Sequence, residues 1–64
     1  MPETVEDTIE RVFDDMKFET LIGWADMLNV PHNEDEWSSD EWLDKEGELR
    51  VQVAAAMIRF LEKT

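Results

Sequence analysis

Apolar residues recur at helical intervals near the start of the chain. The intervals of four, three, one and three positions place on one helical stripe Val5, Ile9, Val12, Phe13 and Met16. Thr4 precedes this stripe and suits an N-cap, because a threonine hydroxyl can accept a hydrogen bond from a free amide of the first turn. The pattern predicts a first helix over about residues 4–16.

A second apolar segment predicts a helix over about residues 19–28. Too many of its positions are apolar for a single surface stripe, so we expect this helix to be covered on two sides. Asn29 suits a left-handed helix end, and Pro31 cannot continue a helix. Gly23 either permits a close helix crossing or is tolerated at a cost of about 1 kcal/mol relative to alanine.

The region after the loop favours two helices. Ser38 and Glu41 match a capping box, in which a serine caps the helix and a glutamate reaches back to it. Gly47, with Asp44 as a second candidate N-cap, indicates a break near residues 44–47. We therefore expect a short helix over about residues 39–43 and a long one over about 45–62. One continuous helix over residues 39–62 is the alternative.

The last helix carries two apolar stripes on nearly opposite sides. The first consists of Leu49, Val53, Ala56, Met57 and Phe60, and the second of Val51, Ala54, Ile58 and Leu61. The stripes of all three long helices predict a shared core of Val12, Phe13, Leu21, Leu28, Val53, Met57 and Phe60. Two covering helices cannot hide the whole second stripe, so a homodimer through this helix is one way to cover it.

These elements predict one all-α domain over residues 1–64, a compact bundle of three main helices and one short helix. A chain of 64 residues is too short for more than one domain. It shows no N-terminal signal-peptide pattern and no apolar run near the roughly 18 residues of a membrane span. We therefore expect a cytoplasmic protein that does not bind membranes.

The net charge of the chain is unusual for a small helical bundle. Seventeen acids against six bases give a net charge of −11. Residues 1–16 carry six acids against one arginine, and residues 33–48 carry eight acids against one lysine. Such a field repels nucleic acid and attracts basic surfaces.

Metal binding and catalysis find little support in the sequence. The segment Asn33–Asp44 holds six carboxylates, but Trp37 and Ser38 occupy positions 5 and 6 of a calcium loop, where an oxygen ligand and a glycine are needed. There is no cysteine, no phosphate-binding glycine loop and one histidine, His32, which we expect to be a surface residue. We predict no metal, no cofactor and no enzymatic activity.

Three tryptophans are distributed unevenly. Trp24 shares a helical face with apolar neighbours and is expected in the core. Trp37 and Trp42 lie inside the acidic stretch. They either close the end of the bundle or act as aromatic anchors of an interface, where tryptophan is enriched.

The acidic residues form two groups that could contact a partner. The first acidic row is Glu6, Glu10 and Asp14, which recur every four residues and rise about 6 Å per step along a helix. This step is of the same order as phosphate spacing in nucleic acid, about 3.4 Å per nucleotide. The second acidic row is Asp35, Glu36, Asp40, Glu41 and Asp44, with Glu34 beside it.

In size, charge and lack of cysteine, the chain resembles small acidic DNA-mimic proteins of phages and mobile elements, including anti-restriction and anti-CRISPR inhibitors. The resemblance is one of character over Glu3–Asp15 and Glu34–Glu48, without a shared motif. It implies a non-enzymatic inhibitor that binds a basic nucleic-acid-handling protein through carboxylates in place of phosphates, and does not itself bind nucleic acid. The alternative is a small acidic helical protein-interaction module without mimicry, which could be homodimeric. Salt adaptation or solubility would also explain the charge.

Overall fold

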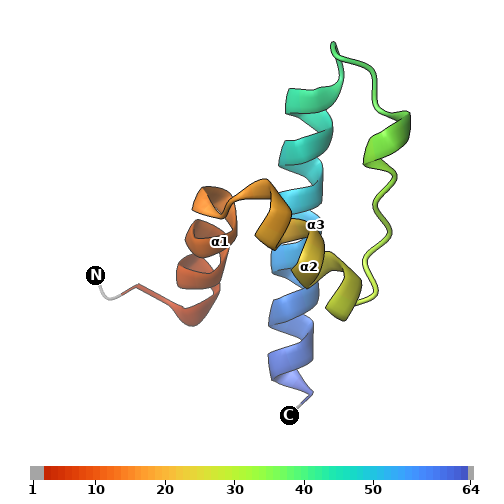
Figure 1. Ribbon diagram of the computed structural model, residues 1–64. Coiled ribbons are helices and arrows are strands. Elements are labelled where there is room, and N and C mark those ends of the chain that lie inside the picture. Colours follow the sequence, from red (N-terminus) through yellow and green to blue (C-terminus); the bar gives the residue numbers. More distant parts are fainter. Residues whose placement is uncertain (1–2, 64) are drawn as a thin grey trace.

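The computed structural model describes residues 3–63 and contains three α-helices in that range (Figure 1). They are α1 (Val5–Asp15), α2 (Phe18–Met27) and α3 (Trp42–Glu62), and a single 3-10 turn, η1 (Glu34–Glu36), lies between α2 and α3. No strand occurs within residues 3–63, so the all-α prediction is confirmed.

The predicted caps of the first two helices are present. The Thr4 side chain accepts a hydrogen bond from the Asp7 amide at 3.1 Å, which begins α1. Asn29 has a φ of 59°, in the left-handed region. The Val30 amide then donates to the Ala25 carbonyl at 2.8 Å, and the Asn29 amide donates to the Asp26 carbonyl at 3.3 Å. These two bonds form the Schellman arrangement that satisfies carbonyls at a helix end.

The predicted break near residues 44–47 is wrong, because α3 runs without interruption from Trp42 to Glu62. Glu46 and Arg50 form an ion pair at 2.6 Å that spans Gly47 and supports the helix across the glycine. A Cβ added at Gly47 or at Gly23 would meet no atom within 4 Å. Gly23 therefore does not serve a close helix crossing.

The predicted capping box is also only half formed. The Ser38 amide donates to the Glu41 carboxylate at 3.3 Å, as a capping box requires. Helix α3 nevertheless begins at Trp42, so Ser38 is not its N-cap. The predicted separate short helix over residues 39–43 does not form: residues 39–41 are a turn, and residues 42 and 43 belong to α3. The Ser38–Glu41 pair instead closes a turn ahead of α3, where the Glu41 amide donates to the Ser38 carbonyl at 3.0 Å.

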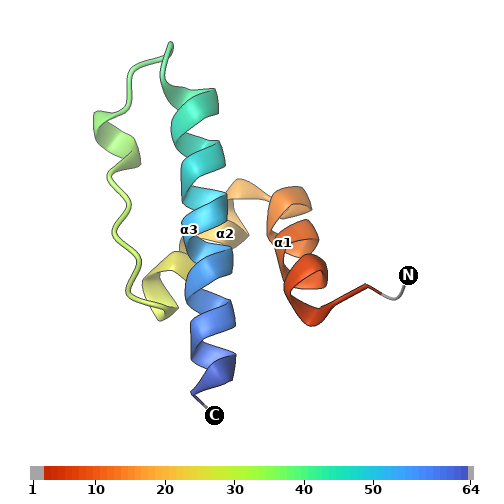
Figure 2. The same cartoon turned by 180° about the vertical axis from the view of Figure 1, so that it is seen from behind.

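The long helix α3 organises the molecule. Helix α1 runs antiparallel to α3 along one side, and α2 crosses α3 on the face seen in Figure 1. The segment that carries η1 returns along the side of α3 opposite to α1 (Figures 1 and 2). The acidic rows on α1 and around η1 are therefore separated by α3.

The core lies where α1 and α2 meet the middle of α3. Its buried members are Phe13, Leu21, Ala25, Leu49, Val53 and Ala54. The structure thus confirms the predicted burial of Phe13, Leu21 and Val53, and packs Leu28 and Met57 partly buried against them. Trp24 packs edge-on against Phe13 with ring centroids 6.1 Å apart, as expected of a core aromatic.

Two predicted core residues are exposed: Val12 by 52% and Phe60 by 54%. Val12 lines a surface hollow with Asp15 and Met16, because Phe13 is the residue of this turn that enters the core. Phe60 is exposed because the helices differ in length. Helix α3 is about 31 Å long at 1.5 Å per residue, whereas α1 and α2 are each only about 15–16 Å. The shorter helices cover the middle of α3, and Phe60 lies near its far end.

Alanine substitutions of Leu21 and Phe60 should therefore lower the free energy of unfolding by different amounts, because Leu21 is buried and Phe60 is exposed. Leu21 has no exposed surface, so Leu21→Ala should lower the free energy of unfolding by about 2–5 kcal/mol. Phe60→Ala should cost about 1 kcal/mol, since half of its surface stays in water. Urea denaturation followed by circular dichroism measures both values. Equal losses for the two variants would contradict the packing.

Candidate functional site

Arg50 of α3 joins α3 to the end of α1. One guanidinium nitrogen, Nη1, donates to the carbonyls of Phe13 and Met16 at 2.6 and 2.7 Å, and Nη2 pairs with Glu46. The last carbonyls of a helix have no partner within it, and a cation is favoured there by the helix dipole. Only 15% of the Arg50 side chain is exposed. This contact fixes where α1 ends against α3.

Sequence reasoning missed this role of Arg50. A hint was present in the sequence of α1. Asp14 and Asp15 stand near the end of this segment with no basic residue in the last turn of α1, although carboxylates are disfavoured at a helix C-terminus. A cation from elsewhere in the chain was needed at that position.

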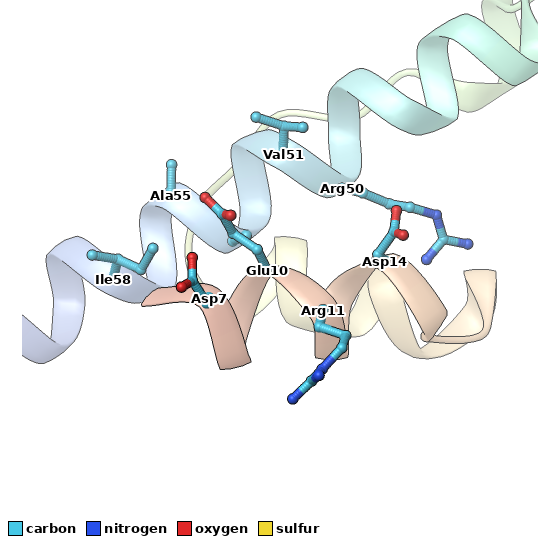
Figure 3. A pocket seen from close by; sticks show the side chains of 9 residues that line it. Asp7, Glu10, Arg11, Asp14, Arg50, Val51, Ala55 and Ile58 are labelled. Atoms are coloured by element: carbon cyan, nitrogen blue, oxygen red, sulfur yellow. The ribbon is translucent and has the colours of Figure 1, made fainter. Parts of the chain in front are cut away.

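A groove of about 520 Å³ lies between α1 and α3 (Figure 3). We call it the α1–α3 groove. Its acidic side is formed by Asp7, Glu10 and Asp14 from α1, and its apolar side by Val51, Ala55 and Ile58 from α3. In Figure 3 the three carboxylates extend toward α3, whereas the Arg11 side chain points away from it.

The first acidic row therefore borders α3. Glu10 and Asp14 line the α1–α3 groove, and Glu6 borders an adjoining hollow with Ile58 and Glu62. All three row members are exposed. Asp7 joins them in the structure, although the sequence pattern did not single it out. Glu62 belongs to the same surface as Glu6.

The second acidic row lies on three consecutive elements of the chain. Asp35 and Glu36 are on η1, Asp40 and Glu41 are in the turn that follows, and Asp44 is in the first turn of α3. All five residues are exposed. The η1 segment, with Asp35 and Glu36, lies on the other side of α3 from α1 (Figure 1), whereas Asp44 is on α3 itself.

Trp37 and Trp42 pack together beneath this segment. Their ring centroids are 4.9 Å apart. The ring centroid of Phe18 lies 6.1 Å from that of Trp37 and 5.1 Å from that of Trp42. Both tryptophans are half-buried. The cluster attaches the acidic loop to the beginnings of α2 and α3. Trp37 and Trp42, the two candidate interface anchors, therefore have a structural role within the domain.

His32 bridges two carboxylates and is more constrained than a surface loop histidine. Its Nε2 lies 2.5 Å from Asp26 at the end of α2, and its Nδ1 lies 2.7 Å from Glu34 on η1. Only 17% of the imidazole is exposed. A protonated ring donates to both carboxylates, whereas a neutral ring can donate to only one. The bridge therefore favours the imidazolium and ties η1 to α2.

This geometry shifts two proton equilibria. The hydrogen bond to Asp26, followed by that to Glu34, raises the pKa of His32 above its ordinary value of 6.5. The hydrogen bond from His32, with one from the backbone amide of Glu34, lowers the pKa of Glu34 below its ordinary value of 4.5. Both shifts stabilise the charged pair.

Among residues 3–63, no group of three or more histidine or acidic side chains is arranged to hold a metal ion. No helix within that range is both long enough and apolar enough to cross a membrane.

Comparison of the chain with protein-family models, with curated proteins and with solved structures finds no match. The fold defines a small all-α domain.

The His32 bridge predicts a specific dependence of stability on pH. Because the folded-state pKa of His32 is raised, its contribution is complete below about pH 6.5 and is lost as the pH rises through the folded-state pKa. Because the folded-state pKa of Glu34 is lowered, its contribution is present above about pH 4.5 and is lost at lower pH. The bridge therefore stabilises the fold most between these limits.

Thermal melts of the parent chain and of His32→Gln from pH 5 to pH 9 test this expectation. The parent should be the more stable at pH 5–6, and the difference in Tm should shrink as the pH rises. A difference that stays constant across the range would show that protonated His32 does not act in this way.

Proposed function

We propose that the chain is a non-enzymatic inhibitor or regulator that binds a basic, nucleic-acid-handling protein through its two acidic rows. In this proposal the carboxylates occupy positions that phosphates of DNA or RNA would otherwise take. The protein itself does not bind nucleic acid, because its field repels phosphates.

One observation carries the proposal: the eight row carboxylates are exposed and form no ion pair with a side chain of residues 3–63. Within residues 3–63 the ion pairs use the carboxylates of Glu3, Asp26, Glu34 and Glu46. None of these four is a member of either row. A partner with Lys and Arg side chains would supply charges that the row residues do not find within residues 3–63.

The rigidity of the first row adds to this support. Its three carboxylates lie on successive turns of a helix whose end is held by Arg50. A helix backbone fixed in this way loses little conformational freedom on binding, so only the rotamers of the row side chains have to be ordered. The second row is held by the Trp37–Trp42 cluster and the His32 bridge. Because α3 separates the rows, a partner that contacts both must extend around α3.

The resemblance in size and charge to phage DNA-mimic proteins agrees with this proposal. An anti-CRISPR or anti-restriction inhibitor would use such a surface to occupy the nucleic-acid channel of a defence complex. The identity of the complex would follow from the protein that is bound.

A second candidate function is a small acidic interaction module without mimicry. The observation in its favour is the apolar surface left on α3, where Val51 is 69% exposed and Leu43 is 85% exposed. A homodimer through this helix would cover such residues. The two functions differ in salt dependence, since burial of apolar surface is not weakened by salt as contacts between exposed charges are.

Capture of the partner from the source cell tests the proposal. Tagged protein is immobilised, bound proteins are identified by mass spectrometry, and the purified partner is then displaced with double-stranded DNA or with polyglutamate of equal charge. Mimicry predicts displacement by DNA at a lower concentration than by polyglutamate, and a steep loss of affinity with salt. Undiminished binding at high salt, or equal displacement by the two polyanions, would rule mimicry out.

Charge reversal locates the binding surface. Glu6→Lys combined with Glu10→Lys should weaken partner binding by roughly tenfold or more, about 1.4 kcal/mol. The matched control is Glu19→Lys with Asp15→Lys, which reverses two exposed carboxylates outside both rows. An equal loss of binding in the control would mean that net charge matters and the rows do not.

A further inference from the structure

We propose that the α1–α3 groove is the docking site for a basic amphipathic helix of the partner. This inference deepens the proposed function, on which the basic character of the partner rests, by naming the element that is bound and where it lies. It depends on the apolar side of the groove as much as on its charge.

The apolar side is an exposed stripe on α3. Val51, Ala55 and Ile58 are separated by four and three residues, so they lie on one face over about 10 Å of helix. Val51 is 69% exposed, Ala55 is exposed and Ile58 is half-buried. Helices that bind in grooves present apolar anchors at the same spacing.

The acidic side runs parallel to this stripe on α1. Asp7, Glu10 and Asp14 are separated by three and four residues and line the groove together with the stripe. In Figure 3 the carboxylates of Asp7 and Glu10 extend toward Ile58 and Ala55, and that of Asp14 lies toward Arg50. The two arginines that also border the groove are already engaged. Arg50 bonds to α1 carbonyls and Glu46, and Arg11 pairs with Glu3 and points away. The groove therefore presents uncompensated negative charge next to apolar surface.

The molecule exposes more surface than its length requires. Its accessible surface is 5016 Å², against about 4,300 Å² expected for a compact folded chain of this length. Its radius of gyration is 12.3 Å, against about 10.7 Å expected. In Figure 2 no other helix lies over α3 on the side turned to the viewer. The excess is consistent with a helix that is only partly covered within the monomer.

Charge identifies the occupant. A second copy would bring its own net charge of −11 to the acidic side of the groove, and repulsion opposes that contact. A partner helix with apolar residues on one face and Lys or Arg beside them satisfies both sides of the groove at once. Cationic ends of the side chains can reach the carboxylates while their aliphatic stems cover Val51 and Ile58.

A synthetic peptide provides the first test. The probe is an amphipathic helix of about 15 residues made of leucine and lysine, long enough to be helical when bound. The controls are a scrambled peptide of the same composition and polylysine of the same charge. Amide chemical shifts of the isotope-labelled protein should change around residues 7–14 and 51–58 with the amphipathic peptide. Equal affinity for the scrambled peptide, or changes spread over both acidic rows, would overturn the inference.

Matched variants separate the groove from the rest of the surface. Val51→Glu should weaken peptide binding by roughly tenfold or more, whereas Val12→Glu, at an exposed valine outside the groove, should leave it unchanged. Asp14→Lys should weaken binding more than Asp15→Lys, which makes the same charge change one residue away. Equal effects within either pair would overturn the groove as the site. A dimer of the free protein that Val51→Glu dissociates would identify a second copy as the occupant and overturn the basic helix.

The two proposals fail in different ways. One outcome is that the double variant Glu6→Lys with Glu10→Lys releases the captured partner although the peptide does not bind in the groove. In that case the docking site is wrong and the proposed function stands. If the peptide binds in the groove while DNA fails to displace the captured partner, mimicry is wrong and the docking site stands.

Discussion

The contact between Arg50 and the end of α1 is the interaction on which the rest of the arrangement depends. Helix α1 is short and strongly acidic, and it ends on two aspartates where the helix dipole favours cations. Arg50 reaches from α3 to the carbonyls of Phe13 and Met16 and supplies that missing charge. The same contact holds the C-terminal end of α1 against α3, and the antiparallel course of α1 places Asp7, Glu10 and Asp14 along the groove with the apolar stripe of α3. The α1–α3 groove follows from this arrangement.

The second constraint is length. Two helices of about 15 Å cannot cover one of about 31 Å, so the ends and one face of α3 remain in water. A small domain has few residues with which to hide such surface. The chain uses α2 and α1 for the central core and leaves Val51, Leu43 and Phe60 exposed. Exposed apolar surface next to fixed carboxylates is what the proposed partner helix would recognise.

Much of the fold could be predicted from the sequence because it rests on local rules. Helical periodicity located α1 and α2, the Thr4 cap began α1, and Asn29 ended α2 in the left-handed conformation. The prediction failed where tertiary contacts override a local preference. Gly47 would favour a break, but the packing of Leu49 and Val53 in the core maintains the helix through it, with the Glu46–Arg50 pair as local support.

The candidate site could be predicted only in part for the same reason. Periodicity placed Glu6, Glu10 and Asp14 on one side of a helix, and the structure keeps them together and exposed. Nothing local indicated that α3 would lie beside them, or that Asp7 would join them. The His32 bridge likewise needs Asp26 and Glu34 to approach from different elements. Such contacts depend on how helices are arranged, which the pattern of a single segment does not contain.

Native-state hydrogen exchange of an Arg50→Met variant tests most directly whether Arg50 holds α1 against α3. Methionine keeps much of the aliphatic length and removes the donors. Charge-assisted hydrogen bonds of this kind contribute about 1.5–3 kcal/mol. The amides of α1 should therefore lose protection by roughly tenfold or more, while those in the middle of α3 change much less. Loss of protection to the same extent in α1 and α3, or no loss in α1, would contradict a specific attachment of α1 through Arg50.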